Sequence, residues 1–79
     1  MNLGEVINKI QPGQIAKATF ATREHWYIIK DDAGFIRECR KDGRMYENSY
    51  PLMLTYSNLN AYYEFYIVTK WPFGARKEI

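Results

Sequence analysis

A β-hairpin signal in the middle of the chain constrains the fold more than any other feature. Two runs rich in aromatic and β-branched residues, 26–30 and 35–39, flank the four residues Asp31-Asp32-Ala33-Gly34. Such runs favour strands, and a short connection that contains glycine is typical of a hairpin turn. Gly34 can adopt the positive φ that this kind of turn requires. The centre of the chain is therefore predicted to form two antiparallel strands.

The residues before this hairpin predict one helix and one strand. Four apolar residues share one helical face, at the spacing i, i+3, i+4 and i+7: Leu3, Val6, Ile7 and Ile10. Asn2 is a suitable N-cap, Glu5 completes a capping box, and Pro12-Gly13 ends the helix. Residues 14–20 then alternate, with Ile15, Lys17 and Thr19 on one side and Ala16, Ala18 and Phe20 on the other. This alternation predicts a strand with one face in water.

The residues after the hairpin predict a loop, two strands and a second helix. In order, we expect an exposed loop over 40–49, an edge strand from Pro51 to Leu54, a short helix over 58–62 capped by Thr55 or Ser57, a strand over 64–70 and a loosely held tail over 71–79. The prediction is a single α+β domain over residues 1–70. In it a small antiparallel sheet packs against the N-terminal helix, and the short second helix precedes the last strand.

The charges and the rare residue types narrow the classes of function. Eleven Lys and Arg against nine Asp and Glu give a formal net charge of +2, which argues against a nucleic-acid coat protein and against a membrane-surface binder. One cysteine excludes an intramolecular disulfide, and one histidine cannot complete a histidine-rich metal site. No apolar run reaches the roughly 18 residues that span a bilayer. We therefore expect a cytoplasmic protein that does not associate with a membrane and binds no metal or cofactor.

Groups that could catalyse a reaction are scarce. A serine or cysteine nucleophile would need His25 as its base, and no surrounding motif resembles a known nucleophile site. His25 is better explained as a strand-end residue half in water, and Cys39 as a small apolar residue. Asp31 and Asp32 fit a turn better than a metal site. We predict that the protein is not an enzyme, and the alternative is a two-carboxylate mechanism that uses Glu64 and a group from another subunit.

The aromatic residues are concentrated in the second half of the chain. Nine of the thirteen follow position 45. Packing within the sheet accounts for about half of them, and the rest predict a subunit interface, a base-stacking site or both. Cations that can hold phosphates crowd the first half: Lys17, Arg23, Arg37, Arg40, Lys41 and Arg44. The simpler interpretation of the run 37–44 is a solvated loop.

The motifs at the two ends of the chain occur in a familiar order. The start contains Met1-Asn2-Leu3-Gly4-Glu5-Val6-Ile7, a turn at Gly13 and Ile15-Ala16-Lys17, and the closing part contains Ser57-Asn58-Leu59, Ala61 and Glu64-Phe65-Tyr66-Ile67-Val68. This order resembles the second Thoeris anti-defence family of phage proteins. Phe20 and Phe65 stand where that family has tryptophan, and Ala21-Thr22 replaces its Asn-Gly. These departures affect the identity of the ligand more than the fold.

The resemblance implies a small phage protein that acts in the cytoplasm of the infected bacterial host. It would form a homo-oligomer, either a dimer or a tetramer, and sequester a nucleotide-derived second messenger without cleaving it, in pockets between subunits. The messenger would be of the cyclic ADP-ribose type or a cyclic oligonucleotide. The predicted ligand-binding residues, from the resemblance and from the cations and aromatics, are Lys17, Phe20, Arg23, Trp26, Arg37, Glu64 and Phe65.

Two other functions stay open at this point. The first is a protein inhibitor that docks directly on a host defence or replication protein through a tyrosine-rich face. The second is a single-strand nucleic-acid binder that uses the same rings, which the small net charge of +2 disfavours.

Overall fold

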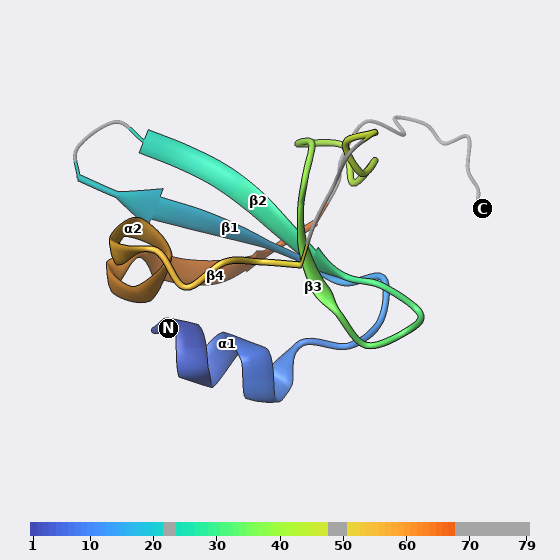
Figure 1. The fold of residues 1–79 in the computed structure, drawn as a ribbon, viewed down its shortest axis with the longest axis horizontal. Coiled ribbons are helices and arrows are strands. Elements are labelled where there is room, and N and C mark those ends of the chain that lie inside the picture. The colour runs from blue at the N-terminus through green and yellow to red at the C-terminus, as the bar shows by residue number, and fades with distance from the viewer. Residues whose placement is uncertain (22–23, 48–50, 68–79) are drawn as a thin grey trace.

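A four-stranded antiparallel sheet with the strand order β3-β2-β1-β4 forms the centre of the protein. The structure, a computed structural model, describes residues 1–21, 24–47 and 51–67. In chain order the elements are α1 (Leu3–Lys9), β1 (Ile15–Phe20), β2 (Glu24–Lys30), β3 (Ile36–Cys39), α2 (Tyr56–Asn60) and β4 (Tyr62–Tyr66). Helix α1 lies on one side of the sheet, and the segment that follows β3 rises on the other (Figure 1). The predicted α+β fold, with a short second helix before the last strand, is confirmed.

The capping box predicted for the first helix is present. The Glu5 backbone N–H donates to Asn2 Oδ1 over 2.9 Å, and the Asn2 backbone N–H donates to Glu5 Oε1 over 2.8 Å. Both bonds satisfy amides that a helix leaves unpaired in its first turn. After Ile10 the chain turns at Gly13, whose φ of +84° lies in the left-handed region that favours glycine. These local signals fix the start and the end of α1.

The core lies between α1 and the face of the sheet that α1 covers, which we call the inner face. Its buried residues are Leu3, Val6, Ile10, Ala16, Ala18, Ile28, Ala61 and Tyr63. Ala16 and Ala18 lie on the central strand β1 and are completely buried. They belong to the same buried cluster as Leu3, Val6 and Ile10, while α1 itself comes closest to β4 and α2. The side of β1 that carries Ala16 and Ala18 therefore faces the core that α1 covers.

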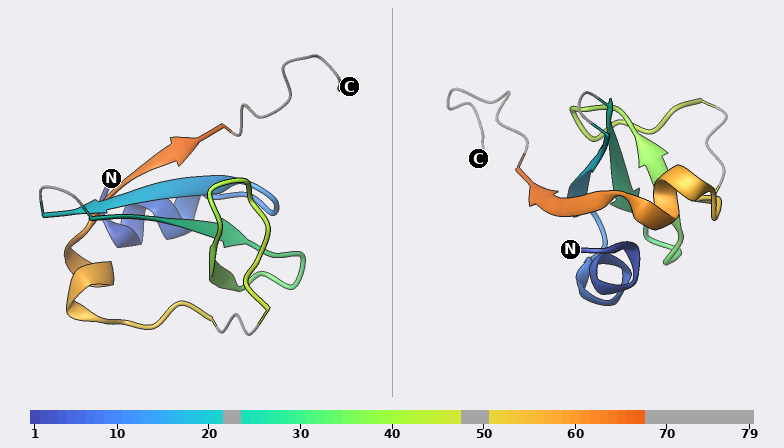
Figure 2. Two further views of the ribbon diagram at one scale, coloured as in Figure 1. Left: turned by 90° about the horizontal axis from the view of Figure 1, so that it is seen from above. Right: turned by 90° about the vertical axis from the view of Figure 1, so that its left-hand side faces the viewer.

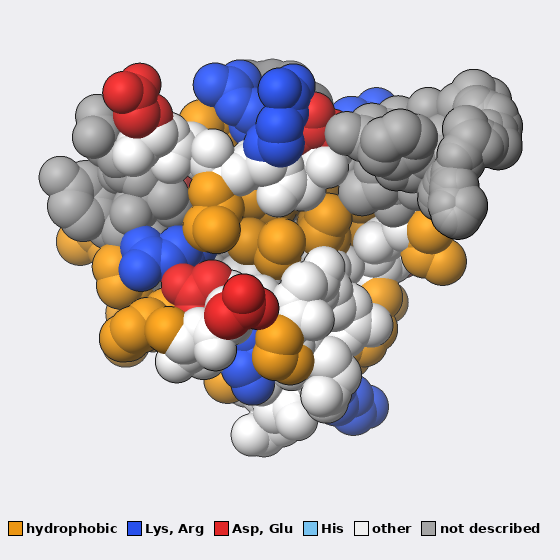
Figure 3. Space-filling view, turned by 90° about the vertical axis from the view of Figure 1, so that its right-hand side faces the viewer, with side chains coloured by type: hydrophobic (Ala, Val, Ile, Leu, Met, Phe, Trp, Pro, Cys, Tyr) orange, Lys and Arg blue, Asp and Glu red, His pale blue; other side chains and the backbone are white. Residues whose placement is uncertain are grey.

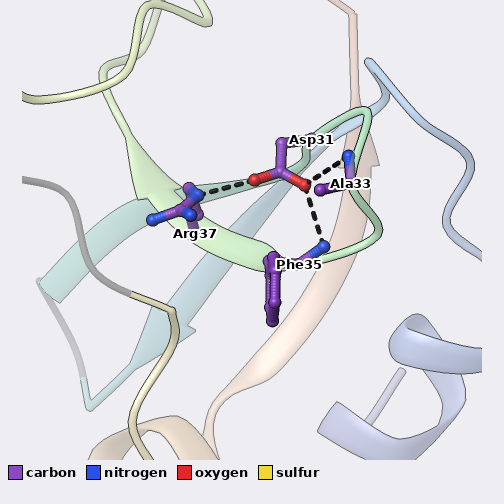
Figure 4. A network of polar contacts seen from close by, with 4 residues as sticks. All are labelled: Asp31, Ala33, Phe35 and Arg37. Atoms are coloured by element: carbon purple, nitrogen blue, oxygen red, sulfur yellow. Dashed lines mark hydrogen bonds and ion pairs between the residues drawn. The ribbon is translucent and has the colours of Figure 1, made fainter.

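The hairpin formed by β2 and β3 closes through the carboxylate of Asp31. Asp31 Oδ1 accepts from the backbone N–H groups of Ala33, at 3.0 Å, and Phe35, at 2.9 Å. The other oxygen, Oδ2, accepts from Nε of Arg37 at 2.6 Å (Figure 4). Gly34 has a φ of +95°, as predicted for a turn of this kind. The hairpin is therefore held by a side chain of its turn and by a cation on β3.

The segment between β3 and α2 differs from its prediction. A strand was expected from Pro51 to Leu54, but the structure has only an isolated bridge between Pro51 and Arg37, with the Leu52 N–H donating to the carbonyl of Ile36 at 2.7 Å. Proline has no N–H to give to a ladder, and the chain leaves the edge of β3 after this bridge. The predicted edge strand is therefore wrong.

The second helix and the last strand both begin earlier than predicted. Thr55 is the N-cap, and its side chain accepts from the N–H of Asn58 at 3.1 Å. The helix ends at Asn60 because Ala61 is extended, and β4 starts at Tyr62 instead of residue 64. The Tyr63 hydroxyl donates to the carbonyl of Asn58 at 2.7 Å and ties α2 to the sheet. The predicted tail over 71–79, like residues 68–70 of the predicted strand, lies outside the described residues.

Candidate binding face

The side of the sheet turned away from α1 carries most of the polar residues of the strands, and we call it the outer face. Directly opposite residues of an antiparallel pair share a face, so the registers define its members: Ile15, Lys17, Thr19, His25, Tyr27, Ile29, Arg37, Cys39, Tyr62, Glu64 and Tyr66. Lys17 lies at the centre, with Tyr27 opposite on β2 and Glu64 opposite on β4. The sheet thus brings together residues that are far apart in the sequence.

A loop that follows β3 covers one end of the outer face. Cys39 forms a bridge with Met45, and Gly43 lies so close to Ile15 that a Cβ at position 43 would be 2.8 Å from the Ile15 Cδ1. Cys39 and Ile15 are buried as a result. Burial raises the pKa of the Cys39 thiol to about 11, with smaller contributions from nearby carboxylates. A thiol in this state is a packing residue and a poor nucleophile.

The open part of the outer face combines one cation, one carboxylate and a pair of tyrosines. The rings of Tyr27 and Tyr66 lie 5.0 Å apart between centroids and are tilted by 54°. They approach each other across β1, beside Lys17. Glu64 is exposed, while Lys17 and both tyrosines are half-buried. Half-buried rings beside a cation are suited to a planar ligand with negative charge.

Further polar groups continue along the same face toward the other end of the strands. The Thr19 hydroxyl and His25 Nδ1 lie 3.5 Å apart, at the limit of a hydrogen bond. Tyr62, opposite Thr19 on β4, is exposed. These three side chains offer donors and acceptors that can fix the orientation of a bound molecule.

The arginines predicted to bind a ligand differ in how they are engaged. Arg37 lies on the outer face, but its Nε is bound to Asp31 and its guanidinium lies 5.6 Å from the ring centre of Phe35. Arg40, outside the strands, lies over the ring of Tyr46 at 4.8 Å. Arg23 falls outside the described residues. Arg37 therefore stabilises the hairpin, whatever else it contacts.

The three predicted aromatic ligands lie on the opposite side of the sheet from Lys17, Arg37 and Glu64. Phe20 and Trp26 pack against the core on the inner face, and the Phe20 ring meets Tyr56 of α2 edge to face at 5.9 Å. Phe65 pairs with Ala16 and so belongs to the inner face as well. In one copy of the chain, the predicted site residues thus do not form one cluster.

A shallow depression lies beyond the covered end of the outer face. Its volume is about 390 Å³, and it is lined by Gly13, Ile29, Lys30, Asp31, Asp32, Ala33 and Met45. The space-filling view shows hydrophobic side chains in the middle of this side of the molecule, with Lys and Arg above them and Asp or Glu nearby (Figure 3). None of the predicted site residues lines the depression, and Ile29 is the one outer-face residue in its lining.

The described residues give no support for a metal centre or a membrane span. No three His, Cys, Asp or Glu side chains among them are grouped so that they could hold an ion. Neither described helix has the length and apolar composition needed to cross a bilayer.

Comparisons with protein-family models, with curated proteins and with solved structures find no match to this chain. The resemblance noted in the sequence therefore stays a prediction.

Two members of the candidate binding face, Tyr27 and Tyr66, were not among the predicted site residues. Alternation along the hairpin strand and along the last strand could have placed each on a polar face. Their contact could not be found in this way, because it depends on β4 lying next to β1 in the sheet.

Proposed function

We propose that the protein binds a small anionic ligand with a planar ring, of the class of nucleotide-derived second messengers, on its outer face, and that it holds this ligand without converting it. The observation that carries the proposal is the position of Lys17 beside the paired rings of Tyr27 and Tyr66. The lysine can neutralise a phosphate while a base stacks on a tyrosine. The resemblance to phage anti-defence proteins supports a role in removing an immune signal inside an infected bacterium.

A sequestering protein needs high affinity, and the outer face of one chain is open. To keep a messenger below the concentration that activates its receptor, the Kd must be of nanomolar order, about −12 kcal/mol. One lysine and two rings on an open sheet supply only part of this, because ligands bind most tightly in sites that bury most of their surface. A second copy of the chain that covers or extends the outer face would supply the rest.

Calorimetric titration tests the proposal with cyclic ADP-ribose isomers and cyclic dinucleotides as probes. We expect at least one of them to bind, and Lys17→Ala to weaken that binding by about tenfold or more, or about 1.4 kcal/mol. Lys9→Ala removes the same charge from α1, on the other side of the sheet (Figure 1), and should leave the affinity unchanged. After heat denaturation, chromatography should recover the ligand intact. Absence of binding to every probe, or equal effects of the two variants, would contradict the proposal.

A second candidate function is supported by an apolar patch around α2. Four large apolar side chains there are each at least 51% exposed: Met53, Leu54, Tyr56 and Leu59. Exposed patches of this kind mark sites of protein contact, which favours direct docking on a host protein. If this second function holds, Leu54→Glu should abolish the anti-defence effect in infected cells while ligand titrations show no binding.

A further inference from the structure

The outer edge of β4 is open over part of its length. β4 forms one edge of the sheet, and among the described strands it pairs with β1 alone (Figure 2). Backbone groups of successive residues in a strand point to opposite sides. The backbone N–H and carbonyl of Tyr63 point away from β1. The N–H donates to the carbonyl of Met1 and the carbonyl accepts from the Met1 nitrogen, both at 2.7 Å. By alternation, the backbone groups of Phe65 and Ile67 also point outward.

Nothing within the described part of the chain pairs with this second half of the edge. Met1 occupies the position beside Tyr63, whereas the outward groups of Phe65 and Ile67 have no hydrogen-bond partner there. Their side chains, which lie on the inner face, are 38% and 82% exposed. The edge therefore offers both backbone hydrogen bonds and apolar surface.

Within the described part of the chain, the features that normally protect an edge strand are missing from β4 beyond Tyr63. Natural sheets use lysine, proline, a bulge or a covering segment to prevent strands from pairing with another molecule. Residues 62–67 contain no lysine or proline, and the register of β4 with β1 is continuous. The opposite edge, β3, is covered in part by Pro51 and Leu52. β4 is therefore the edge that can accept an additional strand.

We propose that the additional strand is β4 of a second copy, paired antiparallel about a two-fold axis at Tyr66. Met1 occupies the outward backbone groups of Tyr63, so the partner can pair only with the residues that follow Tyr63. In the register about Tyr66, the outward groups of Phe65 and Ile67 pair with each other across the axis, which gives hydrogen bonds in both directions. The pairing is limited to residues 65–67 of each copy, because the partner's position 69 would otherwise come opposite Tyr63, where Met1 lies.

The side chains of β4 are complementary to a second copy in this register. Phe65 of one chain packs beside the partner's Ile67 on the inner side. Glu64 lies well away from the partner's Glu64, so that like charges are not opposed. The paired segment is short, and interfaces that bury less than about 1,200 Å² are typical of weak association. We therefore expect a dimer that dissociates on dilution.

This dimer extends the proposed function, because it joins the outer faces of the two copies. The argument for the dimer depends on β4 alone, so the dimer can be tested without a ligand. The two Tyr66 rings lie side by side at the axis, each next to its own Tyr27, which gives one continuous aromatic surface between two lysines at position 17. The partner copy thus contributes a ring and a cation to each binding face.

Light scattering across a range of concentrations tests the pairing with two variants at position 67. We expect the apparent mass of the unsubstituted chain and of Ile67→Ala to rise with concentration toward twice the 9.4 kDa of one chain. Ile67→Pro removes the outward N–H without touching the ladder with β1, and it should stay monomeric with an unchanged melting temperature. A monomer at every concentration, or a dimer that Ile67→Pro does not weaken, would overturn the proposal.

Oxidative crosslinking tests the register. Tyr66→Cys places two thiols across the axis, where Cα atoms of a non-hydrogen-bonded pair lie about 4.5 Å apart, so a disulfide should form. Glu64→Cys is the matched control on the same face, with its partner thiol four residue positions, or about 13 Å, away. The unsubstituted chain measures the background from Cys39. Crosslinking of Tyr66→Cys alone supports the register. Equal crosslinking of both variants, or of neither, refutes it. If the unsubstituted chain dimerises in this register but binds none of the probes, the proposed function is contradicted and the dimer is not.

Discussion

Arg37 donates from Nε to Oδ2 of Asp31 over 2.6 Å, and this bond joins β3 to the turn that precedes it. The same carboxylate accepts two backbone N–H groups of the turn. The bond to Arg37, followed by that to the Phe35 N–H, lowers the pKa of Asp31 below its ordinary value of 3.8. The hairpin is therefore most stable when Asp31 is ionised.

The stability of the hairpin should depend on pH through Asp31. Because the folded-state pKa is lowered, the contribution of this carboxylate is complete above pH 3.8 and is lost as the pH falls through the folded-state value. Asp31→Asn should lower the melting temperature at neutral pH and flatten its decline in acid. Asp32→Asn, at the exposed neighbouring position, is the control. Parallel pH profiles of melting temperature for Asp31→Asn and the unsubstituted chain would contradict this role.

Two glycines should respond in opposite ways to alanine. Gly43 has a φ of +91°, and a Cβ there would meet Ile15 Cδ1 at 2.8 Å, so Gly43→Ala should destabilise the protein by about 1 to 3 kcal/mol. At Gly4 the nearest atom to a new Cβ is Asn2 Oδ1 at an ordinary 3.6 Å. Gly4→Ala should be neutral or stabilising by up to about 1 kcal/mol. Urea denaturation measures both, and a neutral Gly43→Ala would show that the loop does not pack on Ile15.

Cys39 should react slowly with thiol reagents in the folded protein. It is only 1% exposed, and burial raises its pKa to about 11 from the ordinary 9.0. Both effects suppress the thiolate that reacts. A colorimetric thiol assay at neutral pH should therefore show full reaction only after denaturant is added. Rapid reaction without denaturant would mean that the loop over Cys39 opens readily.

Phe20 should affect stability more than ligand binding. It packs against the core and meets Tyr56 edge to face. Phe20→Ala should therefore lower the free energy of unfolding, on the scale of about 3 to 5 kcal/mol that truncation of a core phenylalanine costs. Phe20→Leu keeps most of the apolar volume and is the matched control. Thermal melting and titration of the same variants separate the two roles. An unchanged melting temperature with weakened binding would instead assign Phe20 to the ligand, as the family resemblance implies.

Local chemistry made much of this fold predictable. Asn2 and Glu5 marked the start of α1 because a capping box involves only neighbouring residues. Gly34 marked the hairpin turn for the same reason. The wrong edge strand after Pro51 reflects the opposite case: its apolar residues fit a strand, but proline gives no N–H to the ladder and the chain leaves β3 after one bridge. Whether that segment pairs further depends on tertiary structure.

The candidate site could be predicted only in part. Alternation along β1 correctly separated Lys17 from Phe20, but the resemblance joined both in one ligand site. The order of the strands decides which side chains meet, and no local pattern revealed that β4 lies beside β1. The contact between Tyr27 and Tyr66 therefore appears only in the folded chain.

The central position of β1 has a consequence for the order of folding. Its neighbour β2 follows it closely in the sequence, whereas its neighbour β4 joins only after residues 21–61 have closed into a loop. Because longer loops cost more chain entropy to close, we expect β1, β2 and β3 to pair in the transition state and β4 to join later. Two chains that fold at high concentration can then exchange β4 with each other, which would yield a domain-swapped dimer that separates far more slowly than one paired edge to edge.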